Sequence, residues 1–304
     1  VVFKISEECP LMGKLIEDVM SDRLPQGVFA EVYGAGDVGW KLANDDVGLI
    51  WFTGSTTVGQ QLYKLAGEKF IKAVLELGGS NPGIVFEDAD IDMAVEKIYA
   101  RRMRVCGQTC DALKRLIVHE SIFGEVVQKL KDVFESKKIG DPSDLSTDLG
   151  SLAAERQRVL LEDQVKDAVD NGATIVTGGA RPENLDGAYY LPTILTGVTR
   201  DMKVWKEEVF GPVLVVVPFG TEEAALRLGN DTEYGLGSLV FSKDLERAQR
   251  VASQLEAGGV EINKPTRWLS CNPFGGYKKS GMGREMGVVG FRELCQIKVI
   301  SMGK

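Results

Sequence analysis

A carboxylate and a thiol stand out as groups that could do chemistry together. Glu76 lies at the end of an apolar segment that breaks into two glycines at 78–79, and Cys110 follows a Gly-Gln turn at 107–108. The leucines beside Glu76 disfavour its charged form and raise its proton affinity, which suits a general base. Turn or helix-start amides favour the thiolate of Cys110, its reactive form. Such a pair could run acyl transfer through a thioester.

Each residue alone has a simpler explanation. A single Cys near a helix is more often a small core residue than a nucleophile. A Glu before Gly-Gly is more often a solvated loop carboxylate. Both residues, however, belong to a series of ordered motifs: Phe-Thr-Gly-Ser-Thr at 52–56, Leu-Glu-Leu-Gly-Gly at 75–79, Gly-Gln-Thr-Cys at 107–110, Glu-Glu-Val-Phe-Gly-Pro at 207–212 and Asn-Pro-Phe-Gly-Gly at 272–276.

In these motifs the chain resembles the non-acylating branch of the aldehyde dehydrogenase superfamily, most of all its semialdehyde and lactaldehyde dehydrogenases. The resemblance covers essentially the whole chain. It implies that the Cys110 thiolate attacks an aldehyde, that a hydride passes to a nicotinamide, and that Glu76 activates the water that releases a carboxylic acid. The backbone amide of Cys110 is one candidate donor to the oxyanion of this reaction.

The resemblance also implies a segment before residue 1. The second oxyanion donor of the family is an asparagine side chain that precedes the first strand seen here. The chain also begins with Val rather than Met. We therefore expect a processed, truncated or excised chain, and slow aldehyde oxidation by these 304 residues alone.

Two segments near the start are expected to hold the cofactor. Gly54 and Ser55 follow a strand and open a helix, whose free amides and partial positive charge bind phosphate. In the family this turn holds the pyrophosphate, and Ser55 matches the contacting serine; a simple helix cap is the alternative. Lys4 and Glu7 match residues that hold the adenosine ribose, although Ile5 replaces the family's proline. A surface ion pair is the alternative for these two.

The same comparison favours NAD over NADP, because a carboxylate such as Glu7 near the ribose 2′-hydroxyl repels a 2′-phosphate. Glu208 matches the family residue that holds the nicotinamide ribose. Phe210 matches the one that packs near the nicotinamide, with plain core packing as the alternative. Val105 and Lys264 depart from the family, which commonly has Asn at both positions.

The substrate is expected to be a small aldehyde. Arg267 and Trp268 lie where family substrate loops lie, and a cation there could favour an acidic semialdehyde, although simple solvent exposure is the commoner explanation. The net charge of −8 argues against a nucleic-acid partner. No apolar run is long enough to span a bilayer, so no membrane partner is expected.

The numbers of cysteines and histidines indicate in which cellular compartment the protein works and whether it holds a metal. Five cysteines, an odd number, do not suggest a disulfide framework, so we expect reduced thiols in the cytoplasm. With a single histidine, no metal site is evident. The resemblance implies a homo-oligomer, either a dimer or a tetramer.

Alternating strand and helix signals predict an α/β fold with a parallel sheet and crossover helices. The resemblance implies that this is a partial Rossmann-type parallel sheet followed by an α/β catalytic domain. We expect domains at 1–77 for NAD binding, 78–287 for the thiol chemistry and 288–304 for a tail with an oligomerisation strand. The predicted strands are 1–5, 28–33, 48–52, 71–75, 84–86, 116–119, 174–177, 213–218 and 237–241, with a strand-like tail at 296–302. The predicted helices are 10–20, 37–44, 55–66, 93–104, 121–135, 153–171, 222–230 and 245–255.

Two other functions stay open at this point. The chain could be a non-catalytic, truncated homologue that acts in nucleotide binding or assembly. It could also be a residual thioesterase or esterase that uses Cys110 and Glu76 without redox chemistry.

Overall fold

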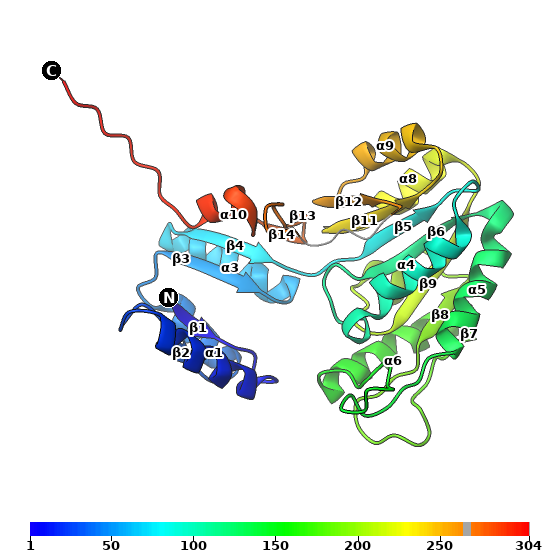
Figure 1. The fold of residues 1–304 in the computed structure, drawn as a ribbon, viewed down its shortest axis with the longest axis horizontal. Coiled ribbons are helices and arrows are strands. Elements are labelled where there is room, and N and C mark those ends of the chain that lie inside the picture. Colours follow the sequence, from blue (N-terminus) through cyan, green and yellow to red (C-terminus); the bar gives the residue numbers. More distant parts are fainter. Residues whose placement is uncertain (264–268, 304) are drawn as a thin grey trace. The chain divides into compact units, whose positions relative to one another are not determined.

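The computed structural model describes residues 1–263 and 269–303. The chain forms two compact units, the first made of Val1–Trp51 and Gln60–Ala73, the second of Phe52–Gly59 and Val74–Lys304 (Figure 1). Lys264, Arg267 and Trp268, which the sequence singled out, lie outside the described residues.

The first unit contains a small parallel sheet with helices. Strands β1 (Val2–Lys4) and β2 (Ala30–Val32) pair in parallel, with Val2 opposite Ala30. The helix α1 (Pro10–Arg23) has proline at its first turn, and α2 (Gly36–Asn44) follows β2. Most of β3 (Leu49–Thr53) and of α3 (Thr56–Lys69) also belongs to this unit.

Several apolar side chains of α1 do not become core in the described unit. Leu11 is 85% exposed, and Leu15 and Val19 are about half exposed. The helical period correctly locates these residues on a helix, but it says nothing about what covers them.

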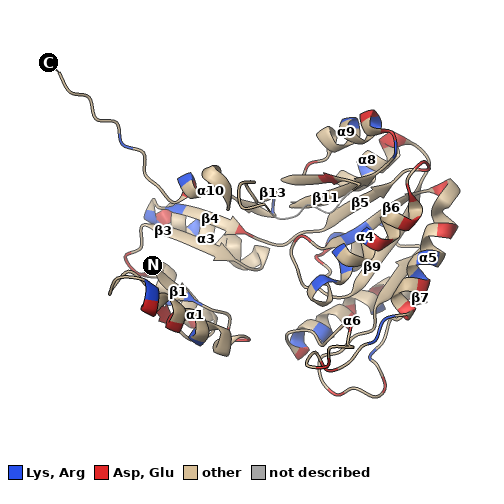
Figure 2. Cartoon of the chain, in the orientation of Figure 1, with Lys and Arg blue, Asp and Glu red and all other residues tan. Residues whose placement is uncertain are grey.

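A seven-stranded sheet organises the second unit. Its strand order is β12-β11-β5-β6-β9-β8-β7, and every neighbouring pair is parallel except β7 with β8. Strands β5, β9 and β11 carry no charged residue, which Figure 2 shows as uninterrupted tan arrows, because both faces of this sheet are covered. The strands are β5 (Asn81–Val85), β6 (Leu113–His119), β7 (Thr174–Thr177), β8 (Thr193–Thr196), β9 (Val213–Phe219), β11 (Gly237–Phe241) and β12 (Gly259–Ile262).

Helices cover the two faces of this sheet with two separate cores. One core joins alternate strand residues to α4 (Ile91–Met103) and α5 (Phe123–Glu135). The other joins the remaining strand residues to α6 (Glu155–Asp170), α8 (Glu222–Asn230) and α9 (Leu245–Gln254). The predicted α/β alternation and these five helices are confirmed within a few residues at each end.

Several short elements escaped the sequence pattern. Strands β8 and β12 are four residues each, and Gly259 and Glu261 weaken the apolar signal of β12. The helix α10 (Gly287–Glu293) was not predicted, because it contains glycines, which have low helix propensity. The remaining elements are η1 (Arg104–Gly107), η2 (Glu120–Ile122), α7 (Lys203–Lys206), β10 (Tyr234–Gly235), β13 (Tyr277–Lys278), β14 (Gly281–Met282) and α10 (Gly287–Glu293).

Strand β4 (Lys72–Glu76) carries the predicted base at its last residue. It pairs antiparallel with β14, with Gly281 opposite Glu76, in the sheet of order β14-β4-β3. The predicted strand-like tail at 296–302 has no regular secondary structure in this single chain, since a strand needs a partner for its backbone groups. Its apolar side chains, including Ile297 and Met302, are exposed.

The turn before Cys110 is strained. Val105 and Cys106 have φ of 51° and 54°, and Gly107 follows with φ of 76°. Only Gly107 suits this left-handed region freely, whereas a β-branched residue such as Val105 is an outlier there. A Cβ on Gly107 would also lie 2.3 Å from the carbonyl oxygen of Gly211. The departure at Val105 therefore has a physical cost, because the family's Asn tolerates this conformation better.

Replacing Val105 should stabilise the protein. Val105→Asn is expected to raise the free energy of unfolding by about 1 kcal/mol, since Asn adopts the left-handed region more easily and Val105 is largely exposed. Urea unfolding measures the change. Val105→Ala is the matched control: it removes the side chain but keeps Cβ, so its gain should be smaller. An Asn variant no more stable than the Val protein would contradict the assignment of strain.

Removing Arg115 should destabilise the second unit strongly. This fully buried guanidinium donates to the carbonyl oxygens of Ser80 (3.0 Å), Leu228 (2.7 Å) and Gly229 (2.9 Å), and burial lowers its pKa to about 10. Arg115→Met would leave these acceptors unpaired and is expected to cost about 3 kcal/mol in urea unfolding.

The exposed Arg227 on α8 provides the control for this experiment. Arg227→Met should change the free energy of unfolding by no more than about 0.5 kcal/mol. A loss below about 1 kcal/mol for Arg115→Met would mean that the carbonyls find other donors.

Candidate active site

Glu76 is buried at the end of β4 with an unpaired carboxyl group. The residue is 2% exposed, and neither carboxyl oxygen has a hydrogen-bond partner among the residues that the structure describes. The 272–276 motif reaches this carboxyl group, because a Cβ on Gly275 would lie 2.9 Å from Glu76 Oε1. Glycine at 275 therefore leaves room beside the acid.

The electrostatic surroundings of Glu76 suit a base. Burial raises its pKa to about 8, the charge of Glu285 adds to the shift, and Arg284 opposes it. The predicted rise in proton affinity is thus confirmed in direction. Sequence reasoning missed Glu285 and Arg284, which follow the Gly-rich 275–283 segment and come close to Glu76 only in the folded chain.

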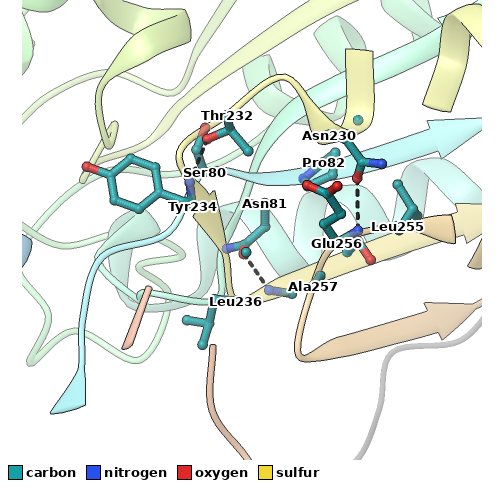
Figure 3. A pocket seen from close by; sticks show the side chains of 14 residues that line it. Ser80, Asn81, Pro82, Asn230, Thr232, Tyr234, Leu236, Leu255, Glu256 and Ala257 are labelled. Carbon is teal, nitrogen blue, oxygen red and sulfur yellow. Dashed lines mark hydrogen bonds between the residues drawn. The ribbon is translucent and has the colours of Figure 1, made fainter. Parts of the chain in front are cut away.

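The side-chain amide of Asn81 anchors the segment that carries Cys110. Its Nδ2 donates to the carbonyl oxygens of Cys110 (2.7 Å) and Ala112 (2.8 Å), and its Oδ1 accepts from the amide of Gly237 (2.7 Å). Figure 3 shows Asn81 at the start of β5, with one of these bonds dashed. This single side chain ties the starts of β5, β6 and β11 together and thereby holds Cys110.

Gln108 holds the turn on the other side of Cys110. Its side chain donates to the carbonyl oxygen of Val105 (3.2 Å) and accepts from the amide of Ala153 (2.9 Å). Gly79 comes so close that a Cβ would lie 2.5 Å from the carbonyl oxygen of Cys110. The motif residues around the thiol are therefore positioning residues for its backbone.

The thiol of Cys110 is not activated by its turn, contrary to the expectation from sequence. Burial, followed by the charge of Asp111, raises its pKa to about 12, and Lys114 opposes this shift. The charges of Glu208 and Glu76 raise it further, which places both carboxyl groups within electrostatic reach of the sulfur. The surroundings of Cys110 therefore favour the neutral thiol over the thiolate.

Cys106 occupies a different environment. Its Sγ donates to the carbonyl oxygen of Gly150 at 3.4 Å, and it packs against both cores. Burial raises its pKa as well, and no carboxyl group is among the causes. Its contacts are those of a small packed side chain.

The predicted phosphate-binding turn lies beside Glu76. The amide of Gly54 donates to the carbonyl oxygen of Glu76 at 3.0 Å, and the hydroxyl of Ser55 accepts from the amide of Val58 at 3.4 Å. Ser55 thus caps the start of α3, in line with the simpler explanation given above, and a capping serine at a helix start can still face an anion.

Glu208 and Phe210 lie next to the Cys110 segment. The amide of Gly79 donates to Glu208 Oε1 at 3.1 Å, and a Cβ on Gly78 would lie 2.5 Å from Glu208 Oε2. Lys114, which sequence reasoning missed, binds Glu208 and lies 5.7 Å from the centre of the Phe210 ring. Its position four residues after Cys110 was the only signal available.

Lys4 and Glu7 form an ion pair of 3.8 Å in the first unit. The ammonium of Lys4 also donates to the carbonyl oxygens of Ile5 (2.7 Å) and Gly34 (2.8 Å), and its side chain is mostly buried. This is more than a surface pair, because the loop that carries Glu7 is fixed through Lys4.

Two measured hollows do not coincide with the predicted site. A cavity of about 10 Å³ lies behind Asn81 and Tyr234 (Figure 3), too small for a substrate. A hollow of about 630 Å³ lies on α8, beside Arg200 and Asp231, and contains none of the predicted site residues. Within the described residues, no helix is long and apolar enough to cross a membrane.

The geometry of the second unit therefore brings together a thiol, a buried acid with a pKa near neutrality, a helix start and a paired carboxylate. A thiol and a nearby base can carry out acyl transfer through a thioester. Comparison with known proteins identifies the family in which this arrangement is found.

The aldehyde dehydrogenase family model matches residues 1–300. The chain is 43% identical to succinate-semialdehyde dehydrogenase [NADP(+)] of Deinococcus radiodurans, over 99% of this chain and 63% of that protein. It is 44% identical to the peroxisomal aminoaldehyde dehydrogenase 1 of Pisum sativum, over 97% of this chain and 59% of that protein.

Solved structures agree with this match. Betaine aldehyde dehydrogenase of Staphylococcus aureus in complex with NAD+ superposes with a TM-score of 0.93 at 38% identity, over 96% of this chain and 59% of that one. An aldehyde dehydrogenase of Mycobacterium tuberculosis complexed with NAD+ gives 0.94 at 34% identity, over 97% and 62%. The chain thus spans about 60% of the length of these relatives. It has their α/β fold and belongs to the aldehyde dehydrogenase family.

Proposed function

We propose that this protein oxidises an aldehyde to a carboxylic acid with NAD(P), using Cys110 as the nucleophile and Glu76 as the general base. One observation carries the proposal: a buried, unpaired carboxyl group with a pKa of about 8 lies within electrostatic reach of a thiol held by backbone contacts. Named relatives act on semialdehydes, aminoaldehydes and betaine aldehyde, which supports an aldehyde substrate.

The chain's own residues account for most of the steps. The Cys110 thiol gives its proton to solvent and its sulfur attacks the aldehyde carbon, giving a thiohemiacetal whose oxyanion accepts a hydrogen bond from a backbone amide such as that of Cys110. A nicotinamide cofactor held beside Glu208 and Phe210 would supply the hydride acceptor that the conversion of the thiohemiacetal to a thioester requires. Glu76 then takes a proton from water, which attacks the thioester and releases the acid. Because Glu76 has no hydrogen-bond partner in the described chain, its oxygens are free to bind that water.

The cofactor residues stay those of the sequence prediction, namely Gly54, Ser55, Lys4, Glu7, Glu208 and Phe210. The helix start at Ser55 suits a phosphate because helix N-termini attract anions. The Glu208 carboxylate beside the glycine at 78 suits a ribose because its oxygens accept hydrogen bonds from hydroxyl groups. We favour NAD over NADP because of Glu7, although relatives of both kinds exist.

The domain roles follow from the same proposal. Residues 1–77 would serve NAD binding, 78–287 the thiol chemistry, and 288–304 assembly into a homo-oligomer. The exposed apolar side chains of the tail support the last assignment. The cytoplasmic location expected from the cysteine content stays a prediction.

Substitution of the two catalytic residues tests the proposal. NADH formation with a panel of aldehydes is expected to fall by at least about 10³-fold in Cys110→Ser. Glu76→Gln should keep a single turnover of NADH, because hydride transfer precedes water attack, while steady-state turnover falls by about 10²- to 10⁴-fold. Since the base must be ionised, turnover limited by thioester hydrolysis should rise with pH through about 8.

Cys106→Ser is the matched control for Cys110→Ser. Glu96→Gln, on the exposed face of α4, is the matched control for Glu76→Gln. Both should leave the rate and its pH dependence unchanged. Activity that survives Cys110→Ser but is lost in Cys106→Ser would refute the assignment of the nucleophile.

The cofactor preference is tested by calorimetry. The protein is expected to bind NAD more tightly than NADP, and Glu7→Ala should narrow the difference by removing the charge that repels a 2′-phosphate. Glu8→Ala, one residue away, serves as the control and should keep the preference. Tighter binding of NADP by the unsubstituted protein would show that Glu7 does not face the 2′ position.

A further inference from the structure

Lys114 is a fully buried cation that the proposed reaction does not use. Lys114 is the second residue of β6, and its side chain is 1% exposed. The ammonium donates to Glu208 Oε1 at 2.6 Å, to the carbonyl oxygen of Gly79 at 2.6 Å and to that of Cys110 at 3.3 Å. Three acceptors match the three donors of a charged ammonium, whereas a neutral amine would have only two.

The buried charge of Lys114 is stabilised by one ion pair, with Glu208, and by hydrogen bonds to two carbonyl oxygens. Taking an ammonium out of water is strongly unfavourable unless it is paired and hydrogen-bonded. Burial lowers the pKa of Lys114, and the carboxylate of Glu208 works against that shift. The three acceptors come from three segments that are distant in sequence, so Lys114 fastens the 78–79 glycines, the Cys110 segment and the Glu208 loop to one another.

We propose that Lys114 is a positioning residue that ties Glu208 to the Cys110 segment and holds a positive charge against the backbone of that segment. The part that concerns Glu208 as a ribose-binding group rests on the proposed function. The part that concerns the thiol does not depend on the proposed function.

The tie determines which oxygen of Glu208 is available to a ligand. Oε1 accepts from Lys114 and from the amide of Gly79. Oε2 accepts no hydrogen bond from the residues that the structure describes, and only glycine at position 78 leaves space beside it. Lys114 therefore holds the carboxylate with one oxygen occupied and the other presented.

The positive charge of Lys114 lowers the pKa of the Cys110 thiol, whereas three anionic groups raise it. Asp111, Glu208 and Glu76 are the anionic groups that raise the pKa of the thiol, and Lys114 is the cation that lowers it. Asp111 is itself paired with Arg101 at 3.1 Å. Arg102, a fully buried cation whose charge lowers the pKa of Lys114, donates to the carbonyl oxygens of Leu113, Gly107 and Val209. Lys114 should thus lower the pKa of the Cys110 thiol, and Glu208 should raise it.

Alkylation of Cys110 by iodoacetamide, followed against pH by site-resolved mass spectrometry without cofactor, tests this opposition. Lys114→Met should slow alkylation about tenfold or more below the thiol pKa, because one pKa unit changes the thiolate fraction tenfold. Glu208→Gln should accelerate it, because Lys114 then acts unopposed. The double variant Lys114→Met/Glu208→Gln should lie between the two single variants. Lys131→Met, on α5, is the control and should leave the pH profile unchanged.

Each outcome decides the proposal. An unchanged pH profile in Lys114→Met, or a shift of both single variants in the same direction, overturns it. Should Lys114→Met fail to fold by circular dichroism, Glu208→Gln decides alone: a rate that does not rise overturns the proposal.

Calorimetry with NAD separates this proposal from the proposed function. Lys114→Met should weaken NAD binding about as much as Glu208→Gln does. The first variant releases the Glu208 carboxylate from its partner, and the second removes that carboxylate. If the unsubstituted protein binds no NAD, the proposed function fails, and alkylation still decides the role of Lys114 at the thiol. Normal NAD binding by a folded Lys114→Met would overturn the part of the proposal that concerns Glu208.

Discussion

The rest of the site depends on the side-chain amide of Asn81. It satisfies two carbonyl oxygens in the Cys110 segment and one amide at the start of β11, where three parallel strands begin. A segment between a helix and a strand has backbone groups that must find partners when buried. By supplying them from β5, Asn81 holds Cys110 on the rigid sheet rather than on a free loop, so that the other groups can be placed relative to a fixed sulfur.

Close approach of backbones brings the remaining groups to that sulfur. Gly79 lies against the Cys110 carbonyl, and Gly107 lies against the carbonyl of Gly211. A side chain at either position would push the segments apart. The carbonyl groups that converge here are satisfied by buried cations, Arg102 and Lys114, which explains why charged side chains lie fully inside a fold of this kind.

Burial has the same effect on both reactive groups, because it disfavours the charged form of each. It raises the pKa of Glu76 to about 8 and that of Cys110 to about 12. An uncharged acid costs less to bury than a carboxylate, and a neutral thiol is less prone to side reactions. The activation that the chemistry requires must therefore come from nearby charge or from a ligand, not from the turn amides.

The sequence by itself determined the family, the α/β alternation and the identity of the candidate groups, because motifs such as 75–79 and 107–110 are local and the strand and helix periods are short-range. It did not reveal that Leu11 and Leu15 stay exposed, nor that the tail at 296–302 forms no strand in a single chain, because both depend on what covers the residue. It also missed Lys114, Glu285 and Asn81, whose partners lie far away along the chain. Only the tertiary structure decided the direction of the Cys110 pKa, because the largest cause is desolvation by burial, which depends on what packs around the thiol and not on the local turn that the sequence shows.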